Sequence, residues 1–112
     1  MTTRPAHLET VAERLLELVS KDGSVEVVMV RIGKPQQTPD HHWACTYQIM
    51  GETIERTQAI YGEDSMQALL LALSVLRVEM EAEARTTGRS LAWIGEKDIG
   101  LPDASWLKAN AA

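Results

Sequence analysis

The stretch His42-Trp43-Ala44-Cys45-Thr46-Tyr47-Gln48-Ile49-Met50 alternates between apolar and more polar side chains. Successive side chains of a strand point to opposite faces, so Trp43, Cys45, Tyr47 and Ile49 share one face. This pattern predicts a β-strand with one buried face. Cys45 is then a core residue that packs as a small hydrophobe, because burial disfavours the thiolate that a nucleophile needs.

Three more strands are predicted around this stretch, at residues 25–32, at residues 52–61 and, less clearly, at residues 10–19, which are discussed below. Residues 25–32 are rich in β-branched side chains and apolar on both faces, which is typical of a central strand covered on both sides. Residues 52–61 alternate more weakly. Residues 34–41 are expected to form an exposed loop, because Pro35 and Pro39 block regular structure. Short connections favour antiparallel neighbours, so the expected fold class is α+β with a four-stranded antiparallel meander sheet.

Residues 10–19 leave two interpretations open. Val11, Leu15, Leu18 and Val19 recur at helical spacing, and the residue types also favour a helix. The Asp22-Gly23 pair that follows is a strong hairpin signal, and a short turn next to a strand favours an antiparallel strand before it. A strand is therefore expected, with a helix as the alternative.

One long helix is expected to pack on the sheet, from about residue 64 to residue 86. Asp64 can accept a hydrogen bond from the backbone N–H of Gln67, and the Gln67 side chain can reach back, as in a capping box. The sequence Thr86-Thr87-Gly88 predicts the end of the helix. Gly62, just before the helix, is explained by a backbone that needs an unusual φ between strand and helix.

The faces of this helix are more apolar than the sheet alone requires. The expected core stripe consists of Met66, Leu69, Leu70, Leu73, Leu76 and Met80. Leu71 and Val78 fall within the opposite stripe, which is otherwise polar. A second cover is therefore expected, and we predict a homodimer through the helix, since two-fold oligomers are the commonest. Residues 91–107 of the same chain are the alternative cover.

The C-terminal segment is expected to be irregular. Within it, Leu91 to Ile94 is a short apolar run that predicts a fifth strand or a segment packed over the helix. Trp93 is a candidate partner contact, because a tryptophan at a rim marks an interface. Residues 1–7 and 108–112 are expected to be loose tails of a single domain that spans residues 1–112.

Composition argues against several classes of protein. The net charge is −5 and the basic residues are scattered, so nucleic-acid binding is not expected. The chain has no run of about 18 apolar residues, so no membrane-spanning segment is predicted. The single cysteine suits a reducing compartment, and the N-terminus lacks the apolar region of a signal peptide. Together these features predict a cytoplasmic protein.

His41 and His42 stand between Asp40 and Cys45, which suggests a metal site because His and Cys are good zinc ligands. On a strand, however, the two histidines lie on opposite faces, and no second Cys or paired-ligand motif completes a tetrahedral set. A histidine pair at a loop edge is the favoured interpretation, and no cofactor is predicted. The sequence contains no phosphate-binding glycine-rich loop, nucleophile elbow or matched His–carboxylate constellation, so an enzyme is not expected.

Several short motifs follow one another along the chain. They are Ile32-Gly33-x-Pro35, Trp43-x-Cys45-x-Tyr47-x-Ile49-x-Gly51, Gly62-x-Asp64-Ser65-x-Gln67-Ala68-Leu69, Trp93-x-Gly95 and Asp98-x-Gly100-x-Pro102. Over roughly residues 10–102 this combination resembles a family of small bacterial domains of unknown function. The resemblance implies a hairpin at residues 10–19, and it brings no activity, cofactor or substrate.

The expected function is that of a non-enzymatic protein-interaction or accessory module of a bacterial cytosolic protein. Such a module would act as a homodimer or on an unidentified protein partner. The alternative is a small-ligand or metal-binding domain that uses the His41/His42 loop and the helix N-terminus at Asp64 and Gln67, since helix N-termini attract anions.

Overall fold

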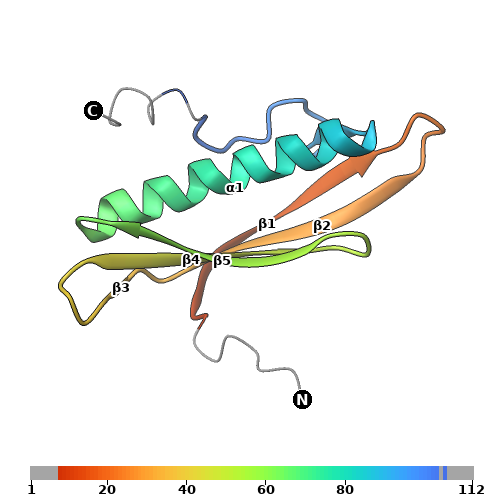
Figure 1. The fold of residues 1–112 in the computed structure, drawn as a ribbon. Helices are drawn as coiled ribbons and strands as arrows, with labels where there is room; N and C mark the ends of the chain where they lie inside the picture. Colours follow the sequence, from red (N-terminus) through yellow and green to blue (C-terminus); the bar gives the residue numbers. More distant parts are fainter. Residues whose placement is uncertain (1–7, 104, 106–112) are drawn as a thin grey trace, which may run out of the picture.

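The computed structural model of the protein describes residues 8–103 and 105, so the two tails expected at residues 1–7 and 108–112 lie outside the described residues. The fold has two layers, with one helix lying across one face of an antiparallel sheet (Figure 1). In the described residues the elements are β1 (Thr10–Val19), β2 (Val25–Gly33), β3 (Gln36–Gln37), β4 (Trp43–Met50), β5 (Glu55–Gly62), α1 (Ser65–Thr87) and β6 (Ser90–Ala92). The expected α+β class is therefore confirmed.

The sheet has six strands in the described part of the chain, not the four expected from the sequence. β1, β2, β4 and β5 form the expected antiparallel meander. β6 pairs with β1 after the helix, and β3 pairs with β4 inside the segment expected to be a loop. β6 has three residues and lies at the apolar run Leu91 to Ile94, for which a fifth strand was one of the two expectations. β3 was not expected, because two residues are too few to show an alternating pattern.

Residues 10–19 form a strand, which settles the open question in favour of the hairpin signal. β1 pairs with β2 along its length, with Leu16 opposite Val28. In the turn between them Gly23 has a φ of 90°, and the Asp22 carboxylate accepts a hydrogen bond from the backbone N–H of Ser24. A left-handed φ is easily adopted only by glycine, so the Asp-Gly pair fixes the turn and with it the strand.

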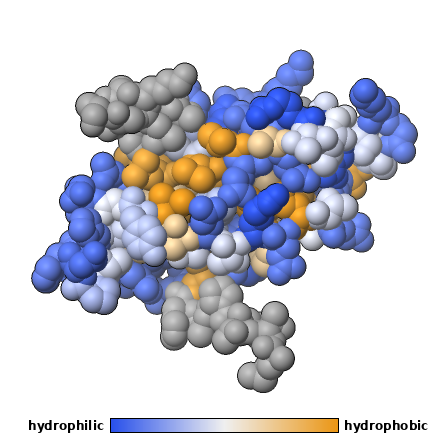
Figure 2. All heavy atoms as spheres, viewed as in Figure 1, coloured by the Kyte–Doolittle hydropathy of each residue, from blue (hydrophilic) through white to orange (hydrophobic). Residues whose placement is uncertain are grey.

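The core lies between α1 and the sheet face that carries Cys45, Tyr47 and Ile49, all fully buried as the alternation of β4 predicts. The expected core stripe of the helix is partly wrong, because Met66 and Leu70 are 63% and 37% exposed. Figure 2 shows apolar residues (orange) at the surface along this end of the helix. The buried stripe of α1 consists of Ala68, Ala72, Leu76, Met80 and Ala84, so Leu76 and Met80 were predicted correctly and the three alanines were not.

This stripe repeats every four residues, so its members lie on one side of the helix. Three of them are alanines, whose small side chains allow the helix axis to lie close to the sheet. The helix begins and ends near the predicted residues, with Asp64 as the N-cap and Gly88 as the C-cap at a φ of 69°. Among the described residues, no helix has both the length and the apolar character needed to cross a membrane.

The second face of the sheet is not covered by any element in the described range (Figure 1). Val25 and Val27 of β2 and Leu15 of β1 point to this open face and are 51%, 55% and 53% exposed. The expectation that β2 is covered on both sides is therefore wrong for the single chain. The one helix of the described chain covers only the face that carries Val28, and the other face stays open.

Candidate functional site

Asp64 and Gln67, two predicted ligand contacts, bind the backbone at the start of α1. The Asp64 carboxylate accepts a hydrogen bond from the backbone N–H of Gln67 at 2.7 Å. The Gln67 side-chain oxygen accepts one from the backbone N–H of Glu63, also at 2.7 Å. This arrangement matches the expected capping box, and it engages two backbone donors that an anion at the helix N-terminus would otherwise use.

Replacing Asp64 by alanine is expected to lower the free energy of unfolding by about 1 kcal/mol, because the backbone N–H of Gln67 loses its acceptor. Asp64→Asn keeps an acceptor oxygen, and its cost should be no more than a few tenths of a kcal/mol, roughly. Urea denaturation of both variants beside the parent measures the two losses. Equal losses would show that the negative charge, and not the hydrogen bond, stabilises the helix start.

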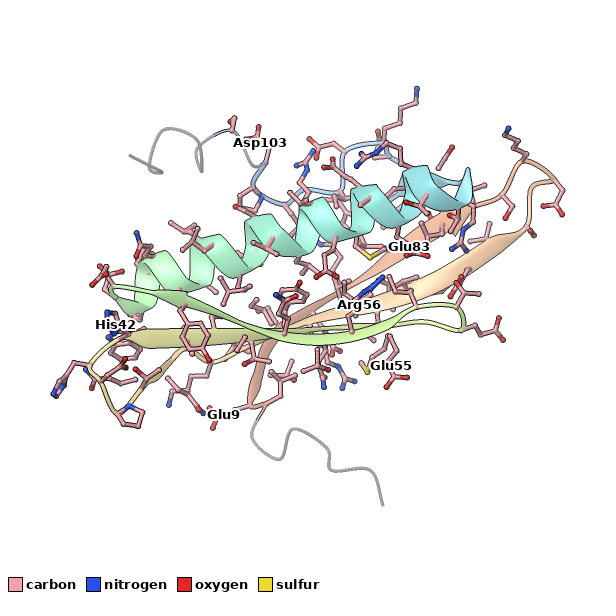
Figure 3. All side chains as sticks on the ribbon, viewed as in Figure 1. Glu9, His42, Glu55, Arg56, Glu83 and Asp103 are labelled. Atoms are coloured by element: carbon pink, nitrogen blue, oxygen red, sulfur yellow. The ribbon has the colours of Figure 1, made fainter. Side chains whose placement is uncertain are left out.

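His41 and His42 lie in the turn between β3 and β4, and His42 lies beside the start of α1 (Figure 3). The His42 Nδ1 is 3.3 Å from the Asp40 carboxylate, and its Nε2 is 3.8 Å from the Glu63 carboxylate. Within the described ranges, no group of three His, Cys, Asp or Glu residues is arranged to hold a metal ion. Cys45 does not join the histidines, because it is buried in β4, and burial raises its pKa to about 11.

Leu71 and Val78 lie on the side of α1 that faces away from the sheet. Val78 is 40% exposed, and Leu71 is half-buried. Ser74, midway between them, is fully buried, and its hydroxyl donates a hydrogen bond to the Leu70 carbonyl. The outer side of the helix is therefore partly covered within the chain itself, although Val78 is not.

The segment after β6 runs beside α1 (blue in Figure 1), where two arginines hold it. Arg77 of α1 donates a hydrogen bond to the Leu101 carbonyl. Arg14 of β1 donates to the Ile99 carbonyl at 2.9 Å, and its guanidinium lies 3.7 Å from the centre of the Trp93 ring. Trp93, a predicted partner contact, is thus a half-buried residue that stacks on Arg14.

A row of polar side chains joins α1 to the sheet, and the sequence pattern alone did not reveal it. The Arg56 guanidinium lies 3.5 Å from the Glu79 carboxylate and 3.6 Å from that of Glu83 (Figure 3). Burial and the hydrogen bond to Glu79 raise the pKa of Tyr47, so its hydroxyl stays protonated and donates to that carboxylate. The whole row consists of Tyr47, Glu79, Arg56, Glu83, Arg89 and Glu26.

The open face of the sheet carries a contiguous group of apolar side chains, here named the open-face patch. Its residues are Leu15, Val19, Val25, Val27, Met29 and Met50. Three carboxylates lie on the same face beside the patch, those of Glu13, Glu17 and Glu55, against one guanidinium, that of Arg31. Arg31 pairs with Glu13 at 3.0 Å, and Glu55 points away from α1 (Figure 3). The face therefore combines an apolar surface with a net negative charge.

Two hollows lie beside α1. A cavity of about 270 Å³ separates the helix from β1, β2 and the C-terminal segment, and Arg14 is part of its lining. A second hollow of about 320 Å³ lies at the start of the helix, next to the predicted residue Asp64. Its lining residues are Lys34, Pro35, Trp43, Ser65, Met66 and Leu69.

A family model described as a domain of unknown function (DUF6968) matches residues 12–103. The match extends from β1 to the segment that Arg14 and Arg77 hold against the helix. The chain belongs to the DUF6968 family. No curated protein and no solved structure matches it.

The DUF6968 description assigns no activity, so the residues have to carry the functional argument. Of the predicted site residues, His42, Asp64 and Gln67 come together at the start of α1, around Glu63. Leu71 and Val78 lie elsewhere on the helix. The sequence pattern did not identify the open-face patch as a surface, because apolar residues on both faces of β2 are also the pattern of a strand buried on both sides.

Proposed function

We propose that this DUF6968 domain is a non-enzymatic protein-interaction module that binds a partner protein through the open-face patch. The observation that supports the proposal is the exposure of Leu15, Val25 and Val27, each more than half exposed on two adjacent strands. Single exposed apolar residues are common on protein surfaces, whereas contiguous patches mark interaction sites. The apolar character of both faces of β2 is consistent with a strand that is covered on its second face by another molecule.

The size of the open face suits a protein interface. β6, β1, β2, β4 and β5 lie side by side. The four long strands have eight to ten residues each and β6 has three. With strands about 4.8 Å apart and about 3.3 Å per residue, this gives an area of roughly 600 Å². A standard interface buries roughly 800 Å² on each partner. The face is therefore large enough to account for most of such an interface.

The charge of the open face favours a basic partner. Glu13, Glu17 and Glu55 outnumber Arg31 there, so the face is net negative. A partner surface with an apolar centre and lysine or arginine residues at its rim would complement this charge. A second copy of the same face would instead bring like charges together. We therefore assign the patch to a different protein. A cytosolic setting is supported by the free thiol of Cys45, the single cysteine of the sequence, since disulfides are rare in reducing compartments.

The double variant Val25→Lys with Val27→Lys tests this proposal, because both side chains are exposed and the change should leave the fold intact. A partner captured from the source cells is purified and titrated against parent and variant. Affinity is expected to fall by about 100-fold or more, as for two residues at the centre of an interface. The control Thr57→Lys adds a charge to the same face outside the patch, and its affinity should stay within about 3-fold of the parent. A complex that tolerates the double variant would contradict the proposal.

A homodimer through α1 is the second candidate. It is supported by the exposure of Met66, Leu70 and Val78 along the helix. The partial cover of the outer side by residues of the same chain, seen at Ser74, reduces the apolar surface left for such a dimer. Light scattering of the parent decides the matter, since a chain that stays monomeric at high concentration does not form it.

A further inference from the structure

The cavity under the C-terminal segment has largely apolar walls, and its charged lining residues are Glu13, Arg14 and Arg31, of which Glu13 and Arg31 pair with each other. Its volume is about 270 Å³. α1 contributes Leu73 and Leu76, and β2 contributes Val30 and Ile32. Leu101 and Pro102 close it on the side of the C-terminal segment, and Arg14 of β1 lines it as well. A largely apolar cleft in which Arg14 is the charged lining residue outside the Glu13–Arg31 ion pair resembles the usual composition of a small-molecule site.

The pairing of the strands explains why this space exists. β6 pairs with β1 only from Glu17 to Val19. Along the first half of β1, the outer edge has no neighbouring strand within the described part of the chain. The segment of residues 99–102 crosses at this place instead, held through backbone carbonyls by Arg14 and Arg77. A crossing segment of this kind fills less volume than a paired strand would.

Arg14 differs from the other arginines that contact this region. Arg31 pairs with Glu13, and Arg77 pairs with Glu81. The Arg14 guanidinium has no carboxylate within ion-pair distance among the described residues. Its Nη1 donates to the carbonyls of residues 99 and 100, whereas its Nε and Nη2 meet no acceptor in the described ranges. A half-buried cation without a counter-ion is electrostatically unfavourable, and an anion placed beside it would offset that cost.

We propose that this cavity binds a small apolar carboxylate, with the carboxylate at Arg14 and the apolar body against Leu73 and Leu76. A carboxylate matches the planar guanidinium, which can donate two parallel hydrogen bonds to it. The volume sets the size of the ligand. An apolar cavity of about 150 Å³ holds benzene, so a cavity of about 270 Å³ holds roughly ten non-hydrogen atoms. An arylalkanoate or a medium-chain fatty acid falls in this range.

The structural role of Arg14 does not account for these features. Holding the C-terminal segment needs only Nη1 and the stacking on Trp93. It explains neither the apolar space beside the guanidinium nor the missing counter-ion. The site is distinct from the open-face patch, because no residue of that patch lines the cavity.

The test compares 3-phenylpropionate with 3-phenylpropanol, which have the same apolar body and differ in charge. Each is titrated into ¹⁵N-labelled parent protein and followed by NMR. The acid is expected to give saturable shifts at Ala12, Leu73 and Leu101, which line the cavity. The alcohol should bind about ten-fold more weakly or worse, because it lacks a charge-assisted hydrogen bond. This comparison needs no variant, so it does not depend on the folding of a mutant.

Two pairs of variants then locate the site. Arg14→Gln can still donate a hydrogen bond but carries no charge, and it should remove the difference between acid and alcohol. Arg14→Lys keeps the charge and should retain part of that difference. Ala12→Phe fills the cavity and should abolish binding of both probes, whereas Ala59→Phe on β5 should not. The proposal is wrong if no saturable shift is seen up to about 20 mM, a limit well above the affinity expected for a ligand of this size. It is also wrong if acid and alcohol bind equally, or if the shifts gather on the open face.

Discussion

Gly62→Ala is expected to lower the free energy of unfolding by about 3 kcal/mol or more, through steric overlap in the packed corner between β5 and α1. A Cβ atom at this position would lie 2.6 Å from the backbone nitrogen of Ala68 and 2.9 Å from its Cα. Both contacts are to backbone atoms in α1, so no side chain can rotate out of the way. β5 and the start of the helix would have to move apart, which would loosen the packing of Ala68 and Ala72 on the sheet.

This prediction also corrects the interpretation of Gly62 from the sequence, where an unusual φ was expected. The φ of Gly62 is not in the left-handed region, so close approach and not backbone conformation requires the glycine. Gly88 offers a matched control, because it has a φ of 69° and a Cβ atom added there would have nothing within 4 Å. Gly88→Ala should cost only about 1–2 kcal/mol, the penalty of a left-handed alanine. Denaturant unfolding of both variants compares them, and a smaller loss for Gly62→Ala would refute the steric explanation.

The parts of the fold that the sequence predicted correctly are those with long, regular patterns. In β4 the alternation from Trp43 to Ile49 coincides with the buried face of a strand that lies inside the sheet. The helix bounds were predicted because Asp64 and Gly88 act locally, through backbone hydrogen bonds and a left-handed φ. Signals of this kind depend on neighbours in sequence, and they can be recognised without knowledge of the tertiary structure.

The side of α1 that faces the sheet could not be predicted from such local signals. Two apolar stripes are available on the helix, one rich in leucine and one rich in alanine. Hydrophobicity favours the stripe that contains Met66 and Leu70, whereas the structure buries Ala68 and Ala72. The choice depends on how close the helix comes to the sheet at Gly62. That distance is a property of the assembled layers, and periodicity contains no information about it.

The candidate sites show the same difference between contacts that are local in sequence and contacts that form only in the tertiary structure. The cap at Asp64 was predicted, because its partner is three residues away. The cavity and its cation were missed, because Arg14 meets the Ile99 carbonyl across 85 residues of sequence. The row of polar side chains between α1 and the sheet was also missed. Two of its members, Glu26 and Arg56, are charged residues at positions of β2 and β5 that face the core. A charged residue on the core side of a strand is a usable signal, since such a residue requires a buried partner.

Arg89→Ala is expected to lower the free energy of unfolding by about 3 kcal/mol at neutral pH, because it leaves a buried carboxylate without its cation. The Arg89 guanidinium lies 2.6 Å from the Glu26 carboxylate, and the two side chains are only 12% and 10% exposed. Thr53 still donates to Glu26 in the variant, so part of the stabilisation should remain. Arg85 is the matched control, because it is exposed in the last turn of α1. Arg85→Ala should cost about 0.5 kcal/mol or less.

The pH dependence of that loss shows whether Arg89 acts through the carboxylates with which it pairs, Glu26 at 2.6 Å and Glu83 at 3.6 Å. The hydrogen bond from the Thr53 hydroxyl, together with those from the Thr53 backbone and Arg89, lowers the pKa of Glu26 from 4.5 to about 2. A carboxyl group whose pKa is lower in the folded state stabilises the fold above its unfolded pKa. That stability is lost as the pH falls from about 4.5 towards 2. Without Arg89 the folded pKa rises towards 4.5, so the variant has less stability to lose, and its difference from the parent should shrink between pH 7 and pH 3. Urea unfolding at both pH values measures this difference. A loss that is equal at both would mean that Arg89 stabilises the domain by packing its side chain and not by its charge.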